Sequence, residues 1–392
     1  MKLLSKLPKE HVFQESDSNT CGPWGFYNSR NTKLVMEQLL KTLFALLAID
    51  SPSGQEEKVA DFLIQKLQEL GLTTEKDTTG NVIGVLPGKG ESLLLTAHMD
   101  RVVPGKGNTP IRDGDMLKSD GTTNLGTDDA AGIAVILEAV NEILQQKLSH
   151  PPLVILFTVK EEIGLQGART FDFAKYKVKH GIGYDNAFDA GVIVGSGATY
   201  ESFDVEIIGK QTHPGKDLSL GINALKIFQE IDWMLGVSDN GATRINVGQV
   251  HAGAARNVVP GSVKIQGELR STLSENMVTQ KLQYLEENIR NICEKYGATY
   301  TFTTNRHAAS YVVDENEPLV QVYKKVLEKR GAKLQLQQTF VASDANCLRG
   351  EKGIQIFTIS TGVIDEHTTE ESVKISDLVQ LTKDLVNLLK IV

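Results

Sequence analysis

Hydrophobic residues recur with a helical period along two segments near the start of the chain. The first, KLVMEQLLKTLFALLAI, begins at Lys33 and stops at the SPSG turn of residues 51–54. The second, EEKVADFLIQKLQELG, ends on Gly71, a residue type that commonly ends helices. The pattern predicts two amphipathic helices. A polar, irregular extension over residues 1–32 precedes them, and we expect no chemistry there.

Beyond Gly71, short apolar runs alternate with helical patterns. Strands are expected in NVIGVLPG, ESLLLTAHMD, PPLVILFTVKEEIG, GIGYDNA and AGVIVGSG, and a long helix in DDAAGIAVILEAVNEILQQ. Apolar strands separated by helices are typical of a largely parallel sheet that is covered on both faces. This predicts an α/β domain over residues 33–197, which residues 309–392 complete with two helices and the strand IQIFTIS.

The pattern changes near Ala198 and changes back near residue 309. YESFDVEIIGK alternates like a half-exposed antiparallel strand, and the segments that follow read helix, strand, strand, helix, strand. This β-α-β-β-α-β order suits a ferredoxin-like domain. The fold expected is therefore an α/β domain with a mostly parallel sheet, into which a smaller α+β domain over residues 198–308 is inserted.

Composition narrows the class of protein. A chain of 392 residues exceeds the usual size of one core, which agrees with two domains. A net charge of -8 argues against a nucleic-acid or anionic-membrane partner, and no apolar run reaches the roughly 18 residues of a membrane span. Three cysteines without a CxxC pair argue against a disulfide framework. With no apolar signal segment at the start, we expect a cytoplasmic protein.

The first candidate for chemistry is the HxD pair of AHMD. His98 and Asp100 stand two residues apart at the end of an apolar strand, so their side chains point to the same face. A metal-binding histidine commonly needs a carboxylate on its other ring nitrogen. The pair fits that arrangement, but a surface histidine beside a salt-bridging aspartate would look the same.

Two further acidic pairs follow. Asp128 and Asp129 of GTDDAAG open the long helix, where acids also serve as ordinary helix caps. Glu161 and Glu162 end the strand VILFTV. Adjacent acids there repel each other unless cations balance them, although a solvated turn is the alternative.

Two single residues complete the series, and the order of all of them is more specific than any one. Asp185 of YDNA follows an apolar strand, and His367 of DEHTTEE lies in a polar loop after IQIFTIS. The series HxD, DD, EE, Asp and a distant His resembles the M20 metallopeptidases. The strings HMDRVVPG, SDGTTNLGTDDAAG and SDAN resemble the peptidase T branch of that family.

The resemblance implies a cluster of two divalent metal ions. His98 and Asp185 would bind one ion, Glu162 and His367 the other, and Asp128 would bridge both. The three carboxylates nearly balance two divalent ions once a bridging hydroxide is added. Nitrogen and oxygen ligands make Zn2+ the default, with Co2+ or Mn2+ as substitutes.

The resemblance also implies roles for the neighbouring acids. Asp100 would orient His98, and Glu161 would be the general base that moves the proton of the attacking water to the leaving amine. Asp129 would be a helix cap rather than a ligand. Two positions depart from the family pattern: Ala130 stands where Lys or Arg is frequent, and Arg101 stands where a small residue is usual, which predicts a narrower pocket.

Three residues of the inserted domain resemble the family's substrate contacts. They are His213 of QTHPG, Asn257 of RNVVP and Arg270 of ELRS. A turn histidine before Pro214 and an ordinary strand cation at Arg270 are the alternatives. Members of the family also form homodimers through this domain.

The function that we expect is cleavage of an amide bond at the end of a short peptide, by an aminopeptidase of the tripeptidase type. A carboxypeptidase or an N-acyl-amino-acid deacylase of the same family is the first alternative. A non-catalytic binding protein on this scaffold is the second, and it would predict lost ligands or a lost base. Here none of these residues is lost.

Overall fold

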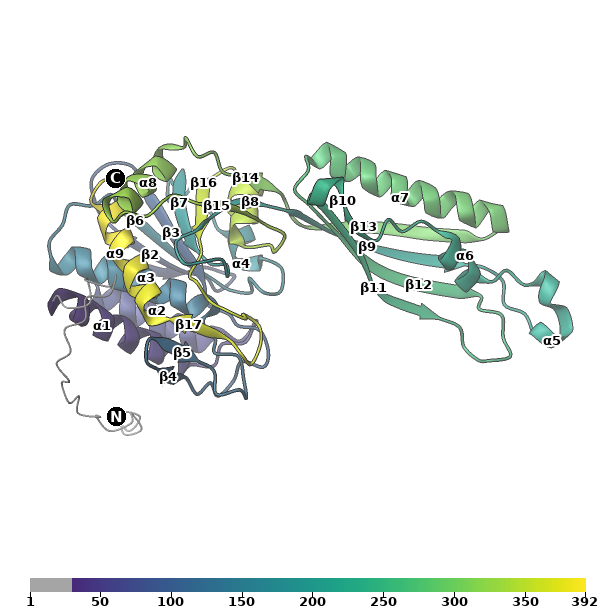
Figure 1. Cartoon of the computed structure of the whole chain (residues 1–392), viewed down its shortest axis with the longest axis horizontal. Helices are drawn as coiled ribbons and strands as arrows, with labels where there is room; N and C mark the ends of the chain where they lie inside the picture. The colour runs from purple at the N-terminus through teal and green to yellow at the C-terminus, as the bar shows by residue number, and fades with distance from the viewer. Residues whose placement is uncertain (1–29) are drawn as a thin grey trace.

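The structure is a computed structural model that describes residues 30–392, and the predicted extension lies almost entirely outside them. Two bodies lie side by side along the long axis of the molecule (Figure 1). The larger one contains both ends of the described chain, and the smaller one is formed by the middle of the sequence. The first helix begins at Arg30, three residues before the expected start.

The larger body carries the residues expected to bind metal and to catalyse, and we therefore call it the catalytic domain. It is built on a nine-stranded mixed sheet in the order β1-β2-β6-β3-β7-β16-β8-β14, with β15 beside β8. Its strands are β1 (Thr73–Lys76), β2 (Val82–Leu86), β3 (Leu93–His98), β6 (Leu153–Thr158), β7 (His180–Tyr184), β8 (Ile193–Gly197), β14 (Tyr311–Val312), β15 (Leu336–Thr339) and β16 (Gln355–Ile359). The central strands β6, β3, β7 and β16 run parallel, whereas β1, β2 and β14 pair antiparallel. The prediction of a mostly parallel sheet is confirmed for this centre.

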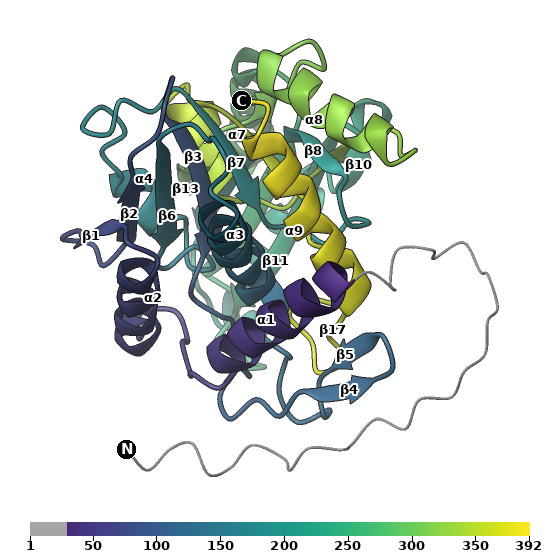
Figure 2. The ribbon, with the colours of Figure 1, turned by 90° about the vertical axis from the view of Figure 1, so that its left-hand side faces the viewer.

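Helices cover the sheet and bury its apolar strands. They are α1 (Arg30–Leu47), α2 (Glu57–Glu69), α3 (Thr127–Gln145), α4 (Gln166–Thr170), α8 (Pro318–Lys329), α9 (Ile375–Leu389) and the π-helical segment η3 (Asn346–Glu351). Helix α3 packs on β3 and β7, and α1 and α9 lie against it (Figure 2). All six residues of β3 and of β6 are buried, as their unbroken apolar runs require. No helix of residues 30–392 is long and apolar enough to cross a membrane.

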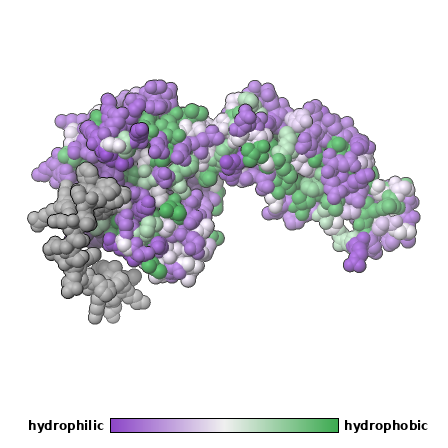
Figure 3. Space-filling view, in the orientation of Figure 1, coloured by the Kyte–Doolittle hydropathy of each residue, from purple (hydrophilic) through white to green (hydrophobic). Residues whose placement is uncertain are grey.

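The smaller body, which we call the lid, has its own sheet and core. Its elements are β9 (Thr199–Ile208), α5 (Pro214–Asp217), η1 (Leu218–Leu220), α6 (Ala224–Glu230), β10 (Gly236–Ser238), η2 (Asp239–Gly241), β11 (Thr243–Ala252), β12 (Ser262–Ser271), α7 (Glu275–Tyr296) and β13 (Thr299–Ala308). The sheet order β10-β11-β12-β9-β13, antiparallel throughout, confirms the ferredoxin-like prediction. Figure 3 shows apolar residues on the lid and at its far end, where Leu218 and Leu220 are exposed.

The carboxyl ends of the parallel strands meet at one edge of the catalytic sheet. There β3 ends at His98, β6 at Thr158, β7 at Tyr184 and β16 at Ile359. The strands β4 (Ile111–Asp113), β5 (Met116–Lys118) and β17 (Ser372–Lys374) form a separate small sheet in the same domain. In open α/β sheets, ligands bind outside these carboxyl ends. The fold therefore brings the loops after four strands to one place.

Candidate metal centre

His98 is the last residue of β3, and its buried ring is held from behind by Asp100. The ring Nδ1 donates to the main-chain oxygen of Asp100 at 3.0 Å, and the nearer carboxylate oxygen of Asp100 is 3.6 Å away. The carboxylate is fully buried and accepts from Ser53 Oγ and from the amides of Glu161 and Glu162. Asp100 therefore fixes the orientation of His98, mainly through its backbone, and also fixes the loop of the two glutamates.

Asp128 lies between two histidines from opposite ends of the sequence. Its Oδ1 is 3.2 Å from His98 Nε2, and its Oδ2 is 3.0 Å from His367 Nε2. The backbone of Asp128 is not helical (φ -86°, ψ 105°), and its peptide bond to Asp129 is cis. Burial would raise the pKa of Asp128, but the hydrogen bonds from His367 and His98 bring it below its usual range. The two oxygens of one carboxylate thus face two different imidazoles.

Asp129 does not share this position, although it is the next residue. Its Oδ1 accepts from the amide of Gly132 at 3.1 Å, which is the contact of a helix-capping side chain. Burial raises the pKa of Asp129 well above its ordinary value. The capping role expected for Asp129 agrees with this contact.

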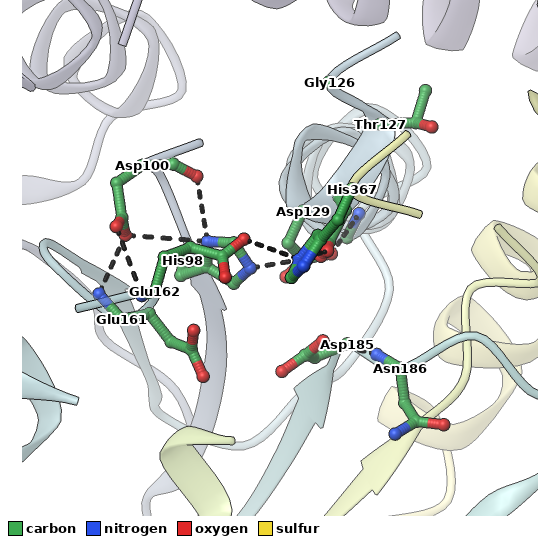
Figure 4. A network of polar contacts seen from close by, with 12 residues as sticks. His98, Asp100, Gly126, Thr127, Asp129, Glu161, Glu162, Asp185, Asn186 and His367 are labelled. Atoms are coloured by element: carbon green, nitrogen blue, oxygen red, sulfur yellow. Dashed lines mark hydrogen bonds and ion pairs between the residues drawn. The ribbon is translucent and has the colours of Figure 1, made fainter. Parts of the chain in front are cut away.

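Glu161 and Glu162 follow β6 in a short turn, and their side chains diverge. Glu162 Oε1 lies 3.0 Å from His367 Nε2. Candidate ligand atoms of His98, Asp128 and Glu162 all lie within 4.8 Å of one another. The carboxyl group of Glu161 points to the same space from another side (Figure 4), and the residue is only 7% exposed. Burial raises the pKa of Glu161, and the charges of Asp185 and Asp344 add to this.

Asp185 completes the ring of acids from the end of β7. Its amide donates to the main-chain oxygen of Ile359, and its carboxylate accepts from the amide of Asn186. The carboxylate faces the space between His98 and His367 (Figure 4). Burial, together with the charge of Asp128, raises the pKa of Asp185 to about 7.

These side chains line a cavity of about 120 Å³ whose charge is strongly negative. Its acidic lining residues are Asp128, Glu161, Glu162, Asp185 and Glu366, and no Lys or Arg of the described chain lines it. Hydrogen bonds to Asp128 and Glu162 raise the pKa of His367 to about 10. Buried carboxylates need cations or protons to balance them. Carboxylate oxygens and imidazole nitrogens of this kind fit a pair of divalent ions well.

Of the three lid residues predicted to contact substrate, only Arg270 lies near the cavity. It lines a second cavity of about 410 Å³ that shares Glu161 and Glu162 with the first. Its guanidinium lies 4.1 Å from the centre of the Tyr200 ring and donates to the main-chain oxygen of Phe340. The arginine therefore stands where the lid joins the catalytic domain.

His213 and Asn257 lie away from the site in this conformation. His213 is exposed beside α5, at the end of the lid far from the catalytic domain (Figure 1), and its Nδ1 accepts from the amide of Gly215. That contact caps α5, which begins at Pro214, and agrees with the alternative of a turn histidine before Pro214. Asn257 is exposed in the loop between β11 and β12.

The expectation that Arg101 narrows the pocket is wrong. Its buried guanidinium points to the end of α1 and donates to the main-chain oxygens of Leu46, Leu47 and Ile49. The carboxyl end of a helix leaves carbonyl groups without partners, and a cation is favoured there. Burial in this position lowers the pKa of Arg101 to about 10, and its role is to join α1 to the strand that carries His98.

The sequence reasoning missed two buried residues of the SDAN segment. Asp344 accepts from Thr158 Oγ1 at the end of β6, and burial raises its pKa to about 6. Asn346 donates from Nδ2 to the main-chain oxygens of Ala198 at 3.0 Å and Ala309 at 2.7 Å, which lie on the two connections to the lid. The polar residues of SDAN between apolar neighbours were the available signal, but the sequence does not show their partners.

Comparison with known proteins gives the family. The model of "Peptidase family M20/M25/M40" matches residues 94–391. The uncharacterized protein YqjE of Bacillus subtilis is 30% identical over 366 residues, covering 90% of this chain and 98% of YqjE.

Two solved structures share the fold over nearly their whole length. Aminopeptidase PepT from Bacillus cereus has a TM-score of 0.85 at 29% identity, covering 91% of this chain and 98% of PepT. A tripeptidase from Staphylococcus aureus has a TM-score of 0.86 at 27% identity, with the same coverage. The chain therefore belongs to the M20 family of metallopeptidases and, within it, to the peptidase T-like branch.

Proposed function

We propose that the protein is a two-metal aminopeptidase of the tripeptidase type, which removes the amino-terminal residue from short peptides. The observation that carries the proposal is the carboxylate of Asp128, whose two oxygens face His98 and His367 separately. A carboxylate held in this way suits a bridge between two cations. The similarity to an aminopeptidase and to a tripeptidase supports the choice of substrate.

The assignment of ligands follows the resemblance to the M20 family. His98 and Asp185 would hold one ion, and Glu162 and His367 the other, with Asp128 shared by both. Zn2+ is the metal proposed, because all five ligands offer nitrogen or oxygen, and Co2+ or Mn2+ could replace it. Such ions, when bound, polarise a carbonyl group and lower the pKa of a water molecule.

The protein residues would then handle the proton and the substrate. Glu161 would accept the proton of the attacking water at its carboxylate and pass it to the nitrogen of the leaving amine. Its buried position favours this role, because burial raises its pKa above the ordinary value of a glutamate. Asp100 would keep the Nδ1 proton of His98 in place and leave Nε2 free for metal.

The lid would supply the remaining contacts to the substrate. Arg270 lines the same cavity as Glu161 and Glu162, and its planar guanidinium suits a carboxylate of the peptide. His213 and Asn257 could reach a substrate only if the lid moves or if they come from the lid of a second subunit. A homodimer through the lid is therefore part of the proposal.

A panel of substrates tests the proposed activity. Metal-loaded protein is incubated with di-, tri- and tetrapeptides and with N-acetylated amino acids, with and without a chelator, and the products are identified by mass. We expect chelator-sensitive release of the amino-terminal residue from tripeptides. Release of the carboxyl-terminal residue or of an acyl group would replace the proposal with a carboxypeptidase or a deacylase, and no product at all would favour a binding protein.

The variant Glu161→Gln tests the proposed base. We expect turnover to fall by about 10²- to 10⁴-fold, the usual contribution of a general acid–base group. Metal content, measured by mass spectrometry, should stay at the wild-type value, since Glu161 is not among the proposed ligands. A variant that remains fully active would remove Glu161 from this role.

A further inference from the structure

Glu371 is a buried carboxylate that holds the loop of Asp128 from behind. Its Oε1 accepts from the amide of Thr127 at 2.7 Å, from the hydroxyl of Thr127 at 2.6 Å and from the amide of Asp128 at 3.2 Å. Its Oε2 accepts from the amide of Gly126 at 3.0 Å. The residue is 1% exposed, so these four donors provide the hydrogen bonds that replace water.

The amides of Gly126, Thr127 and Asp128 need such a partner, because Asp129 caps only the amide of Gly132. The first amides of a helix have no acceptor within the helix. Gly126, at the capping position, has no side chain, and the carboxylate of Asp128 is turned toward the two histidines. A negative charge at a helix amino terminus is also favoured by the helix dipole. Glu371 thus replaces the missing cap from a distant part of the sequence.

We propose that Glu371 is a positioning residue for the metal centre. By binding the amides of Gly126, Thr127 and Asp128, it leaves the Asp128 carboxylate free and directs its oxygens to His98 and His367. This inference depends on the proposed metal cluster but not on which peptide is cleaved.

The same residue ties two of the proposed ligand loops together. Glu371 follows His367 by four residues, in a loop where Asp365 and His367 both have left-handed backbones (φ 54° and 64°). The main-chain oxygen of Glu371 accepts from the amide of Ser119, and β17 begins at the next residue. One side chain anchored by β17 therefore fixes the loop of Asp128 relative to the loop of His367.

Two substitutions and a matched control test the proposal by Co2+ binding, which is followed by visible absorption. Glu371→Ala removes the acceptor for all four donors. Glu371→Gln can keep an oxygen at the Oε1 position but turns an NH2 group toward the amide of Gly126. Glu370→Gln, in the exposed neighbouring residue, makes the same chemical change outside the contact.

We expect the Co2+ affinity of Glu371→Ala to fall by about 10- to 100-fold, the usual effect of losing a residue that orients a metal ligand, with a changed absorption band. The Co2+ affinity of Glu371→Gln should lie between those of Glu371→Ala and the wild type. The Co2+ affinity of Glu370→Gln should equal that of the wild type. If Glu371 had only a structural role, Glu371→Ala would melt at a lower temperature but bind Co2+ with wild-type affinity and spectrum. That result would overturn the proposal.

A milder variant covers the case in which Glu371→Ala does not fold. Thr127→Val removes the hydroxyl donor and keeps the amide, so a smaller loss of Co2+ affinity in the same direction is expected. Unchanged affinity and spectrum in both Thr127→Val and Glu371→Gln would overturn the proposal. Wild-type protein that binds Co2+ but cleaves no peptide would overturn the proposed function alone, whereas wild-type protein that binds no Co2+ would overturn both.

Discussion

At the scale of single residues, neighbouring side chains of the same type have different surroundings. Asp128 faces two histidines, while Asp129 caps the helix that both residues begin. The difference arises from the backbone, because the non-helical φ and ψ of Asp128 turn its side chain away from the helix end. A sequence of two adjacent acids does not reveal this division.

Gly126 gives a prediction at this scale. It has φ +78°, and a Cβ there would lie 2.7 Å from Arg101 Nε and 2.9 Å from Asn108 Nδ2. We expect Gly126→Ala to lower the free energy of unfolding by about 2–3 kcal/mol. The left-handed backbone conformation disfavours alanine, and the new Cβ also has to displace the buried side chain of Arg101. Urea denaturation measures the change.

Gly114→Ala is the matched control. Gly114 is also left-handed, with φ +61°, but nothing lies within 4 Å of its Cβ position. We expect Gly114→Ala to lower the free energy of unfolding by about 1 kcal/mol, because only the left-handed backbone conformation disfavours alanine there. Equal losses in the two variants would show that the contact with Arg101 does not matter.

Much of the candidate site was predictable because its residues follow recognisable strands. The apolar runs that end at His98, Val159 and Tyr184 predicted strands whose ends meet, and the acids beyond them are at that edge. Glu371 and Arg101 were not predictable in the same way. Their partners are determined by tertiary contacts, since Glu371 binds amides 243 to 245 positions away.

At the scale of elements, the connection from β15 to η3 links the lid to the wall of the cavity. Val341, Ala342 and Ser343 line the cavity, and Asn346 at the start of η3 binds both connections to the lid. The Oδ1 of Asn346 accepts from the amide of Ser343. A change of the lid angle therefore has to act on the same segment that lines the cavity.

Substitution of Asn346 tests this link. Asn346→Ala leaves the buried oxygens of Ala198 and Ala309 without their donor, so we expect the free energy of unfolding to fall by about 2–4 kcal/mol. Asn346→Asp should lower the free energy of unfolding at least as much, because it turns a carboxylate oxygen toward two carbonyl groups at neutral pH. Chemical denaturation of both variants makes the comparison, and an aspartate variant as stable as the wild type would contradict it.

At the scale of the whole molecule, the two bodies differ in charge and have separate cores. The acids of the cavity are all in the catalytic domain, and the lid has a separate core around Phe203, Ile227 and Leu285. The fold class followed from the sequence because the two domains have different hydrophobic periods. The distance of His213 from the cavity did not, because no local pattern encodes the angle between two bodies.

Metal removal should therefore affect one body more than the other. In the proposed metal centre, divalent ions would balance the carboxylates of the cavity, and a ligand at 100 times its dissociation constant adds about 2.7 kcal/mol of stability. We expect chelation to lower the melting temperature of the catalytic domain and to leave the unfolding of the lid nearly unchanged. Calorimetry with and without a chelator measures this, and an equal shift of all transitions would mean that the two bodies unfold as one.

The two connections of the lid lie next to each other, as the hydrogen bond from the amide of Ser310 to Thr199 Oγ1 shows. An insert whose two ends lie together can be exchanged as one unit in the gene. Recombination can lengthen, exchange or remove it without changing the order of the strands in the catalytic sheet. Selection can thus alter the lid while the proposed metal ligands of the catalytic domain stay unchanged.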